Sequence, residues 1–546
     1  MKKRLWIAFL SILIIFSLSP MVSACSNGKF RGRKKITIIR DNYGVPHVFA
    51  RTKEELAFGA GYAMAQDRLW QGDLLRRQAF GSLAELGLAS IDSDYNTRRL
   101  WYSREELREI FDKWVPIDPS ARLKEMILAY VDGINFYISE AIDACLNGDL
   151  SLIPIEYLQF GMMPPPIVPF SVEDCMAITV MMAWRFGGTG GNELDYWSGL
   201  ETLKSMYTDE EAWLIFNDLF PQQDPGAETT IPSSEGQYQA SNVIGNSLSL
   251  PLGVIELNKE YNEIQMGQNN LFESLGLPIK FGSNAWIVNP KKTTTKNAMQ
   301  LGGPQMGHTI PQIVLEMGLH GAGIDAVGMM MPAIGPFILI GASKDGAWTS
   351  TTGSSDVQDI YIELLNPLDH TQYLFNGQWV DMEVRTEVFN SPYGSETRDI
   401  YRTIHGPILF IDEVNHLCFT LKVPYFKNEV AAEEGWLLFQ QAKNIKDVEK
   451  AVKTVQASHN FFWADRHGNI GYWHAGTYPI KPETGVGGRL IDDRFPLYGT
   501  GEEEWVGVTG FEEMPKCINP DQGWLANWNN KPMVNWPYGE SDAGWG

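Results

Sequence analysis

The chain changes character near its middle, and this change limits the folds open to it. In the first half, apolar residues recur at helical spacing over Gly59 to Phe80, Glu105 to Ala144 and Val172 to Phe186. From residue 283 onward, short apolar and alternating runs typical of strands dominate. We therefore predict a helix-rich first block, opened by a strand hairpin over Lys35 to Ala50, and a strand-rich second block. Thr52 and Glu55 match the capping box of a helix start just after that hairpin.

The segment from Asp224 to Gly282 separates the two blocks. It is rich in Ser, Gln, Asn and Gly and has weak periodicity, apart from a short apolar patch at Leu250 to Glu256. We expect a connector without regular structure. Such a long structureless stretch is uncommon inside a compact domain, so the pattern favours a linker or a segment removed during maturation.

The acidic net charge of the chain argues against a nucleic-acid partner. The 546 residues include 66 acidic and 44 basic side chains, which gives a net charge of −22 at pH 7. No run of five or six Lys or Arg residues occurs, so a nucleic-acid partner is not expected. After the first thirty residues no apolar stretch is long enough to span a bilayer.

The N-terminus has the layout of an export signal. A basic start, Met1 to Arg4, precedes an apolar core from Leu5 to Pro20 and a small-residue end at Ala24. We predict that residues 1–24 are removed and that the protein is exported to the periplasm or the cell exterior. The step into Cys25 resembles a bacterial lipobox, which would make Cys25 a lipidated first residue that tethers the protein to a membrane. Ordinary signal-peptidase cleavage beside an incidental Cys is the alternative.

The sequence lacks the motifs of several common catalytic, nucleotide-binding and metal sites. The chain has no G-x-S-x-G, H-E-x-x-H, P-loop or G-x-G-x-x-G pattern. The other four cysteines, Cys145, Cys175, Cys418 and Cys517, show no C-x-x-C spacing, which argues against a zinc or thioredoxin-type site, while export permits one or two disulfides. The nine His residues are scattered, and residues such as His320 and His405 fit core or turn positions.

Ser283 stands at the point where the connector ends and a strand pattern begins. If the bond between Gly282 and Ser283 breaks, Ser283 gains a free α-amine beside its own hydroxyl. An α-amine has a pKa of about 7.7–8.0, so it can act as a general base near physiological pH. A hydroxyl nucleophile with its base in the same residue needs no His. A Ser that merely starts a strand after a loop is the structural alternative.

Several short segments of the chain resemble, in order, those of the penicillin acylase family of N-terminal nucleophile hydrolases. They are Ile39 to His47, Gly61 to Leu69, Met182 to Phe186, Ser283 to Trp286, Gly302 to Gln305, Gly318 to Gly323, Gly468 to Tyr472 and Asn527 to Asn530. Each segment is weakly specific alone, but the ordered set covers about 500 residues and is highly specific as a whole.

The resemblance implies an α+β fold with a four-layer αββα sandwich, built from a precursor that cuts itself. The implied parts are a mostly helical α chain over 25–228, a removed spacer over 229–282 and a β chain over 283–546. It implies hydrolysis of an N-acyl amide, such as a penicillin side chain, through an acyl-enzyme on Ser283. Asn529 and the backbone N–H of Thr352 would form the oxyanion hole, and Gln305 would position the nucleophile's end. Donors placed where negative charge develops each contribute about 10²–10³ in rate.

The resemblance also implies a structural calcium site that joins the two chains. Its ligands would be Glu193, Asp356, Asp359, the backbone carbonyl of Gln358 and, as a further carbonyl, Pro479. Carboxylates combined with a backbone carbonyl suit the six to eight oxygen ligands that Ca²⁺ prefers. For the family's last carboxylate, Asp542 and Glu540 are both candidates at a spacing that differs from the family's. A solvated acidic turn is the alternative, and no organic cofactor is expected.

Two departures from the family affect the expected function. The substrate-binding positions are Met182, Phe186, Met306, Ile340 and Ser350, and here Met306 and Ile340 replace two phenylalanines of the phenylacetyl pocket. A softer wall makes an aliphatic acyl group plausible, as in acyl-homoserine lactone acylases. Family members also continue well beyond the segment at Asn530, so this chain is C-terminally short for the family. A truncated, non-catalytic lipoprotein is therefore the second hypothesis.

Overall fold

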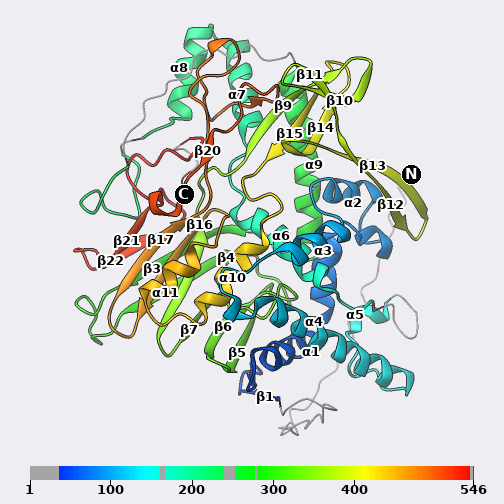
Figure 1. Ribbon diagram of the computed structural model, residues 1–546, viewed down its shortest axis with the longest axis vertical. Coiled ribbons are helices and arrows are strands. Elements are labelled where there is room, and N and C mark those ends of the chain that lie inside the picture. The colour runs from blue at the N-terminus through cyan, green and yellow to red at the C-terminus, as the bar shows by residue number, and fades with distance from the viewer. Residues whose placement is uncertain are drawn as a thin grey trace, which may run out of the picture.

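A computed structural model describes residues 36–159, 167–224, 226–238, 253–276, 280–541 and 545 (Figure 1). The predicted signal segment, Cys25 and Asp542 lie outside these residues. Helices and strands are both abundant, which confirms the α+β class predicted from the sequence. Among the described residues, no helix combines the length and the apolar character needed to cross a membrane.

The first block is a strand hairpin followed by helices, as predicted. Strands β1 (Thr37–Arg40) and β2 (Pro46–Phe49) pair antiparallel, and α1 (Lys53–Ala79) begins with the predicted capping box of Thr52 and Glu55. The other helices are α2 (Ile91–Arg98), α3 (Arg104–Lys113), α4 (Leu123–Leu146), α5 (Ile155–Leu158), α6 (Val172–Gly187), α7 (Glu193–Met206) and α8 (Asp209–Leu219). The long helices α1 and α4 lie side by side in the lower right of Figure 1.

The predicted connector contains a helix, so the expectation that it lacks regular structure was wrong. Helix α9 spans Val254–Ser274, and its Val254 and Phe272 side chains are buried. Asn258 and Asn262 each donate from Nδ2 to one oxygen of Asp195 on α7, at 2.8 and 2.9 Å. The apolar residues Val254, Leu257, Tyr261 and Ile264 do recur at helical spacing, a signal that the polar composition of the segment obscured.

The start of the predicted spacer is also built into the fold. The Thr230 backbone N–H donates to the carbonyl of Lys531, and Tyr238 donates to that of Val534, both at 2.9 Å. Thr230 and Ile231 are almost fully buried. Residues 229–238 therefore pack along the segment that follows the Asn527 to Asn530 motif rather than forming a free linker.

A nine-stranded sheet crosses the boundary between the two blocks. In spatial order it contains β1, β2, β5 (Leu315–Gly321), β6 (Ile324–Met330), β7 (Ile340–Ser343), β8 (Gly346–Thr352), β16 (His459–Asp465), β17 (Ile470–Ala475) and β21 (Lys516–Ile518). The first block joins the second where β2 pairs with β5 in parallel.

A three-stranded sheet contains Ser283. It runs in the order β22 (Trp524–Asn527), β3 (Lys280–Val288) and β4 (Met299–Met306), and Ser283 lies in β3. Ala285 and Ile287 on β3 share a buried cluster with Phe462 on β16 and Tyr472 on β17. The small sheet thus packs against the β16–β17 part of the large one, on the left of Figure 1.

The remaining strands form a second large sheet and a short pair. The sheet contains β11 (Gln378–Asp381), β10 (Asp369–Phe375), β9 (Asp359–Asn366), β15 (Leu417–Lys422), β14 (Gly406–Asp412), β13 (Gly394–Thr403) and β12 (Glu383–Ser391), with β19 (Leu497–Tyr498) beside β9. The pair is β18 (Pro479–Ile480) with β20 (Gly507–Val508), and helices α10 (Val430–Phe439) and α11 (Ile445–Val452) follow β15 in sequence.

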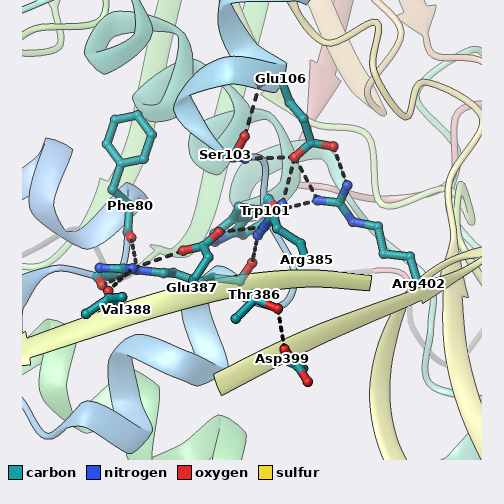
Figure 2. Close-up of polar contacts among 12 residues, drawn as sticks. Phe80, Trp101, Ser103, Glu106, Arg385, Thr386, Glu387, Val388, Asp399 and Arg402 are labelled. Atoms are coloured by element: carbon teal, nitrogen blue, oxygen red, sulfur yellow. Dashed lines mark hydrogen bonds and ion pairs between the residues drawn. The ribbon is translucent and has the colours of Figure 1, made fainter. Parts of the chain in front are cut away.

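An ion-pair network fastens the helical block to this second sheet (Figure 2). Glu106 on α3 accepts from Arg385 on β12 at 2.7 Å and pairs with Arg402 on β13. Arg402 also donates to the carbonyl of Trp101 at 2.6 Å, and Arg98 pairs with Glu387 at 2.9 Å. The guanidinium groups of Arg98, Arg385 and Arg402 are each paired with a carboxylate, so we interpret the network as a structural link between the two blocks.

Candidate active site

Ser283 is buried in the middle of the three-stranded sheet, opposite Pro304 on β4. Its backbone N–H donates to Oδ1 of Asn529 at 2.8 Å, across 246 residues of sequence. The preceding Gly282 faces Gln305, and a Cβ placed on Gly282 would lie 2.6 Å from Oε1 of Gln305. The bond that must break in the cleavage hypothesis therefore lies beside the carboxamide of Gln305, the residue expected to hold this end of the strand.

Asn529 lies just after β22, in a backbone conformation that is uncommon for residues other than glycine. Its φ is +73°, in the left-handed region that Asn tolerates better than most side chains. Its backbone N–H donates to Oδ1 of Asn527 at 3.0 Å, and its Nδ2 donates to the carbonyl of Thr352 at 2.9 Å. An amide nitrogen carries two hydrogens, so Asn529 keeps one donor for a second acceptor.

Thr352 ends β8 beside Asn529. Its hydroxyl donates to the carbonyl of Phe186 at 2.8 Å, and its own carbonyl accepts from Asn529. The structure thus brings Ser283, Asn529, Thr352 and Gln305 together from four separate segments, as the sequence resemblance implies.

An apolar cavity of about 140 Å³ opens beside Ser283. All five predicted substrate-binding residues line it: Met182, Phe186, Met306, Ile340 and Ser350. Sequence reasoning missed several further lining residues, which are Met329, Met331, Phe337, Trp436 and His459. A cavity of about 150 Å³ lined by apolar side chains has room for a benzene molecule. This cavity can therefore hold a side chain of about six carbon atoms.

The predicted calcium residues lie together at the junction of the two blocks. Glu193 begins α7 and is fully buried, while Asp356 and Gln358 immediately precede Asp359, the first residue of β9. Gln358 donates from Nε2 to the carbonyl of Gly190 at 2.9 Å, which ties its loop to the start of α7. Pro479 lies in the short strand β18.

A lysine that the sequence analysis did not consider occupies the centre of this acidic cluster. Nζ of Lys481 lies 2.7 Å from Asp359 and 3.1 Å from both Asp356 and Asp493. Burial alone would lower the pKa of Lys481, but attraction to Asp356 and Asp359 raises it well above its usual value. Among the described residues, no three acidic, His or Cys side chains converge on one point in the way a metal ion requires.

The charge of the cluster nevertheless fits an additional cation. Four buried carboxyl groups, those of Glu193, Asp356, Asp359 and Glu540, and the partly exposed carboxyl group of Asp493 are near one ammonium group. Burial, and then repulsion from Glu540 and Asp359, raises the pKa of Glu193 well above its usual range, and burial raises that of Glu540 to about 7. Oε2 of Glu193 is buried without a hydrogen-bond partner. Hard oxygen donors in excess of positive charge are the donor set that calcium prefers.

Comparison with known proteins decides the family. The family model for penicillin amidase matches residues 35–546. The chain belongs to the penicillin amidase family. Penicillin G acylase of Escherichia coli is 32% identical over 96% of this chain and 62% of its own length. Penicillin acylase 2 proenzyme of Pseudomonas sp. (strain SE83) is 26% identical over 92% of this chain and 59% of its own length.

Other relatives of this chain carry a different name. Acyl-homoserine lactone acylase QuiP of Pseudomonas syringae pv. tomato is 24% identical over 92% of this chain and 56% of its own length. Among solved structures, thermostable penicillin G acylase from Alcaligenes faecalis in orthorhombic form is 35% identical over 46% of each chain, with a TM-score of 0.43. The chain spans about three-fifths of the length of the curated relatives it matches.

Proposed function

We propose that this penicillin amidase family member hydrolyses N-acyl amides through an acyl-enzyme on Ser283, after it has cut its own chain before that residue. The observation that carries the proposal is the hydrogen bond from the backbone nitrogen of Ser283, which lines an apolar cavity, to Asn529. Cleavage between Gly282 and Ser283 converts this nitrogen into an α-amine that keeps the same partner.

The reaction follows from this geometry in two steps. Oγ of Ser283 attacks the acyl carbonyl while the α-amine takes the hydroxyl proton and then gives it to the leaving amine. The negative charge on the carbonyl oxygen is stabilised by Nδ2 of Asn529 and the backbone N–H of Thr352. Water then attacks the ester with the amine again as base, and this step releases the carboxylic acid and restores Ser283.

The cavity supports an acyl side chain of about six carbon atoms, which includes both a phenylacetyl group and a short alkyl chain. Four methionines, Met182, Met306, Met329 and Met331, line it together with Phe186, Phe337 and Trp436. Methionine is flexible and polarizable, so such a wall adapts to an aromatic ring or to an alkyl chain. The methionine content favours an acyl-homoserine lactone type of substrate as the second candidate beside a penicillin side chain.

We propose that Ca²⁺ binds the acidic cluster, through Glu193, Asp356, Asp359, Glu540 and the carbonyls of Gln358 and Pro479. The ion would supply positive charge between the α7 end of the first block and the β9 end of the second. Lys481 supplies part of that charge in any case, because its ammonium group touches three of the carboxylates.

The remaining expectations from the sequence belong to the same proposal. They are the four-layer arrangement of the sandwich, the zymogen-like removal of a spacer, export through the N-terminal signal and a membrane tether at Cys25. Export places the enzyme where extracellular antibiotics or lactone signals would reach it.

The test is a denaturing gel with N-terminal sequencing of the purified protein beside a Ser283→Ala variant, followed by a panel of chromogenic acyl amides. We expect two chains, one starting at Ser283, in the wild type and a single chain in the variant. We also expect hydrolysis of phenylacetyl or hexanoyl amides in preference to dodecanoyl amides. A wild-type chain that stays uncut and inert would instead support the non-catalytic lipoprotein hypothesis.

A further inference from the structure

The carbonyl of Thr352 accepts two hydrogen bonds, and only one of them comes from Asn529. The second donor is Nδ2 of Asn460, at 2.9 Å. The same nitrogen donates to Oγ1 of Thr351 at 3.0 Å, and Thr351 in turn donates to Oδ1 of Asn527 at 2.6 Å. Because that Asn527 oxygen also accepts from the backbone N–H of Asn529, Asn460 is connected to both expected donors of the oxyanion hole.

The orientation of the Asn460 amide follows from its hydrogen bond to the backbone carbonyl of Thr352. A backbone carbonyl only accepts, so the Asn460 atom facing Thr352 must be the nitrogen. The Asn460 oxygen therefore faces the other way, where the hydroxyl of Tyr472 lies 2.6 Å and Nδ1 of His474 lies 2.7 Å from it. Since this oxygen only accepts, His474 must carry its proton on Nδ1.

The other ring nitrogen of His474 is held in the complementary role. Trp536 donates from its indole nitrogen to Oγ of Ser355 at 2.8 Å, which leaves the Ser355 hydroxyl hydrogen to point at Nε2 of His474, 2.7 Å away. Tyr478 lies equally close to Nε2 and also donates to the carbonyl of Ala475. A neutral ring with its proton on Nδ1 donates to Asn460 and accepts from the Ser355 hydroxyl on Nε2, while the Tyr478 hydroxyl hydrogen goes to the carbonyl of Ala475.

Burial favours the same neutral form. Asn460, His474, Tyr472 and Ser355 are fully buried. Burial, with a further contribution from His459, lowers the pKa of His474 to about 3. The ring is therefore a fixed hydrogen-bond donor to Asn460 over the whole working pH range, and not a proton carrier.

We infer that Asn460 and His474 are positioning residues for the oxyanion hole: His474 sets the direction of the Asn460 amide, and Asn460 holds the Thr352 and Asn529 backbones in place. This inference rests on the proposed function. A misplacement of about 1 Å at such a site can reduce a rate about 100-fold. Neither residue is among those that line the acyl cavity, so the effect should fall on turnover more than on substrate binding.

A matched pair of variants separates positioning from packing. The Asn side chain in His474→Asn can place an N–H where Nδ1 was, whereas the longer Gln in His474→Gln reaches the Nε2 position and leaves Asn460 without this donor. Both remove the ring, so both lose packing, but only the second loses the bond to Asn460. We expect kcat for the best amide substrate to fall at least about 10-fold in His474→Gln with KM within about twofold, and to stay within about threefold of wild type in His474→Asn.

A third variant, Tyr472→Phe, is a smaller change that keeps the test valid if the His474 variants fail to fold. Tyr472→Phe removes one hydroxyl donor to the Asn460 oxygen and leaves His474 in place, and we expect a two- to fivefold fall in kcat with unchanged KM. Equal kcat losses in both His474 variants, or a change confined to KM, would overturn the inference while the wild type remains an active acylase. A wild-type chain that is neither cut at Ser283 nor active would overturn the proposed function, and this inference with it.

Discussion

The neutral state of His474 predicts a measurable loss of stability in mild acid. An unfolded His has a pKa near 6.5, whereas burial keeps the folded pKa of His474 at about 3. The unfolded chain therefore binds a proton below pH 6.5 that the folded chain does not bind until about pH 3. The stability that His474 contributes is complete above pH 6.5 and is lost as the pH falls from there toward 3.

The size of the effect follows from this difference in pKa. Each pH unit between the two pKa values costs about 1.4 kcal/mol, so a fall to pH 5 removes about 2 kcal/mol through this residue alone. His474→Asn removes the titrating group and keeps a donor to Asn460. We therefore expect the variant to lose about 2 kcal/mol less than its parent between pH 7.5 and pH 5.

Urea unfolding followed by tryptophan fluorescence measures this difference. Both proteins should carry Ser283→Ala, so that a single uncut chain unfolds and refolds in every sample. Comparing parent and variant at the same two pH values cancels the contributions of the other titrating groups. If both proteins lose the same stability between these pH values, the ring is not buried in its neutral form and the argument for a fixed donor fails.

Three further outcomes test other parts of the site. Lys481→Met should cost about 3–5 kcal/mol of stability in chelator, because it leaves the buried carboxylates of Asp356 and Asp359 without their ammonium partner. Millimolar calcium should restore more stability to the variant than to the wild type, and equal melting shifts in both proteins would refute the cation site. Met306→Ala should enlarge the cavity and shift the substrate preference toward longer acyl chains. With chromogenic amides we expect a change of about 10- to 200-fold in relative kcat/KM. An unchanged ranking of the substrates would place the acyl group elsewhere. Residues 229–238 pair with the segment after Asn530, so we expect them to stay in the processed protein. Intact-mass spectrometry should then find the first chain ending after Tyr238. A first chain that ends at residue 228 would contradict this expectation.

Local signals in the sequence predicted local structure well. The capping box of Thr52 and Glu55 and the turn between β1 and β2 depend on neighbours within a few residues, and both are present. His405 also has the structural role assigned to it, since it is buried between Glu363 at 2.7 Å and Glu504 at 2.6 Å. These features need no knowledge of which distant segments meet.

The features that were missed depend on contacts between distant segments. Helix α9 is held by Asp195, some sixty residues before it in the sequence, and Lys481 reaches Asp356 across 125 residues. His474 was grouped with the scattered histidines because its partners, Ser355 and Trp536, are far away in the sequence. No pattern of spacing along the chain reports such contacts, so only the family resemblance could bring Ser283 and Asn529 together before the structure.

The uncut chain already contains the contact on which the cut enzyme would depend. The Ser283 nitrogen donates to Asn529 as a peptide N–H, and an α-amine at the same place would donate to the same oxygen. Cleavage therefore changes the chemistry of this nitrogen, from an amide that cannot accept a proton to an amine that can, without requiring a new geometry. Because Asn527 accepts from the Asn529 backbone, and Asn460, oriented by His474, donates to the carbonyl of Thr352, the oxyanion hole can be complete before its base exists. Self-processing would then consist of hydrolysing the Gly282–Ser283 bond, with water forming the Gly282 carboxyl group and the Ser283 amine, at a site that is already formed.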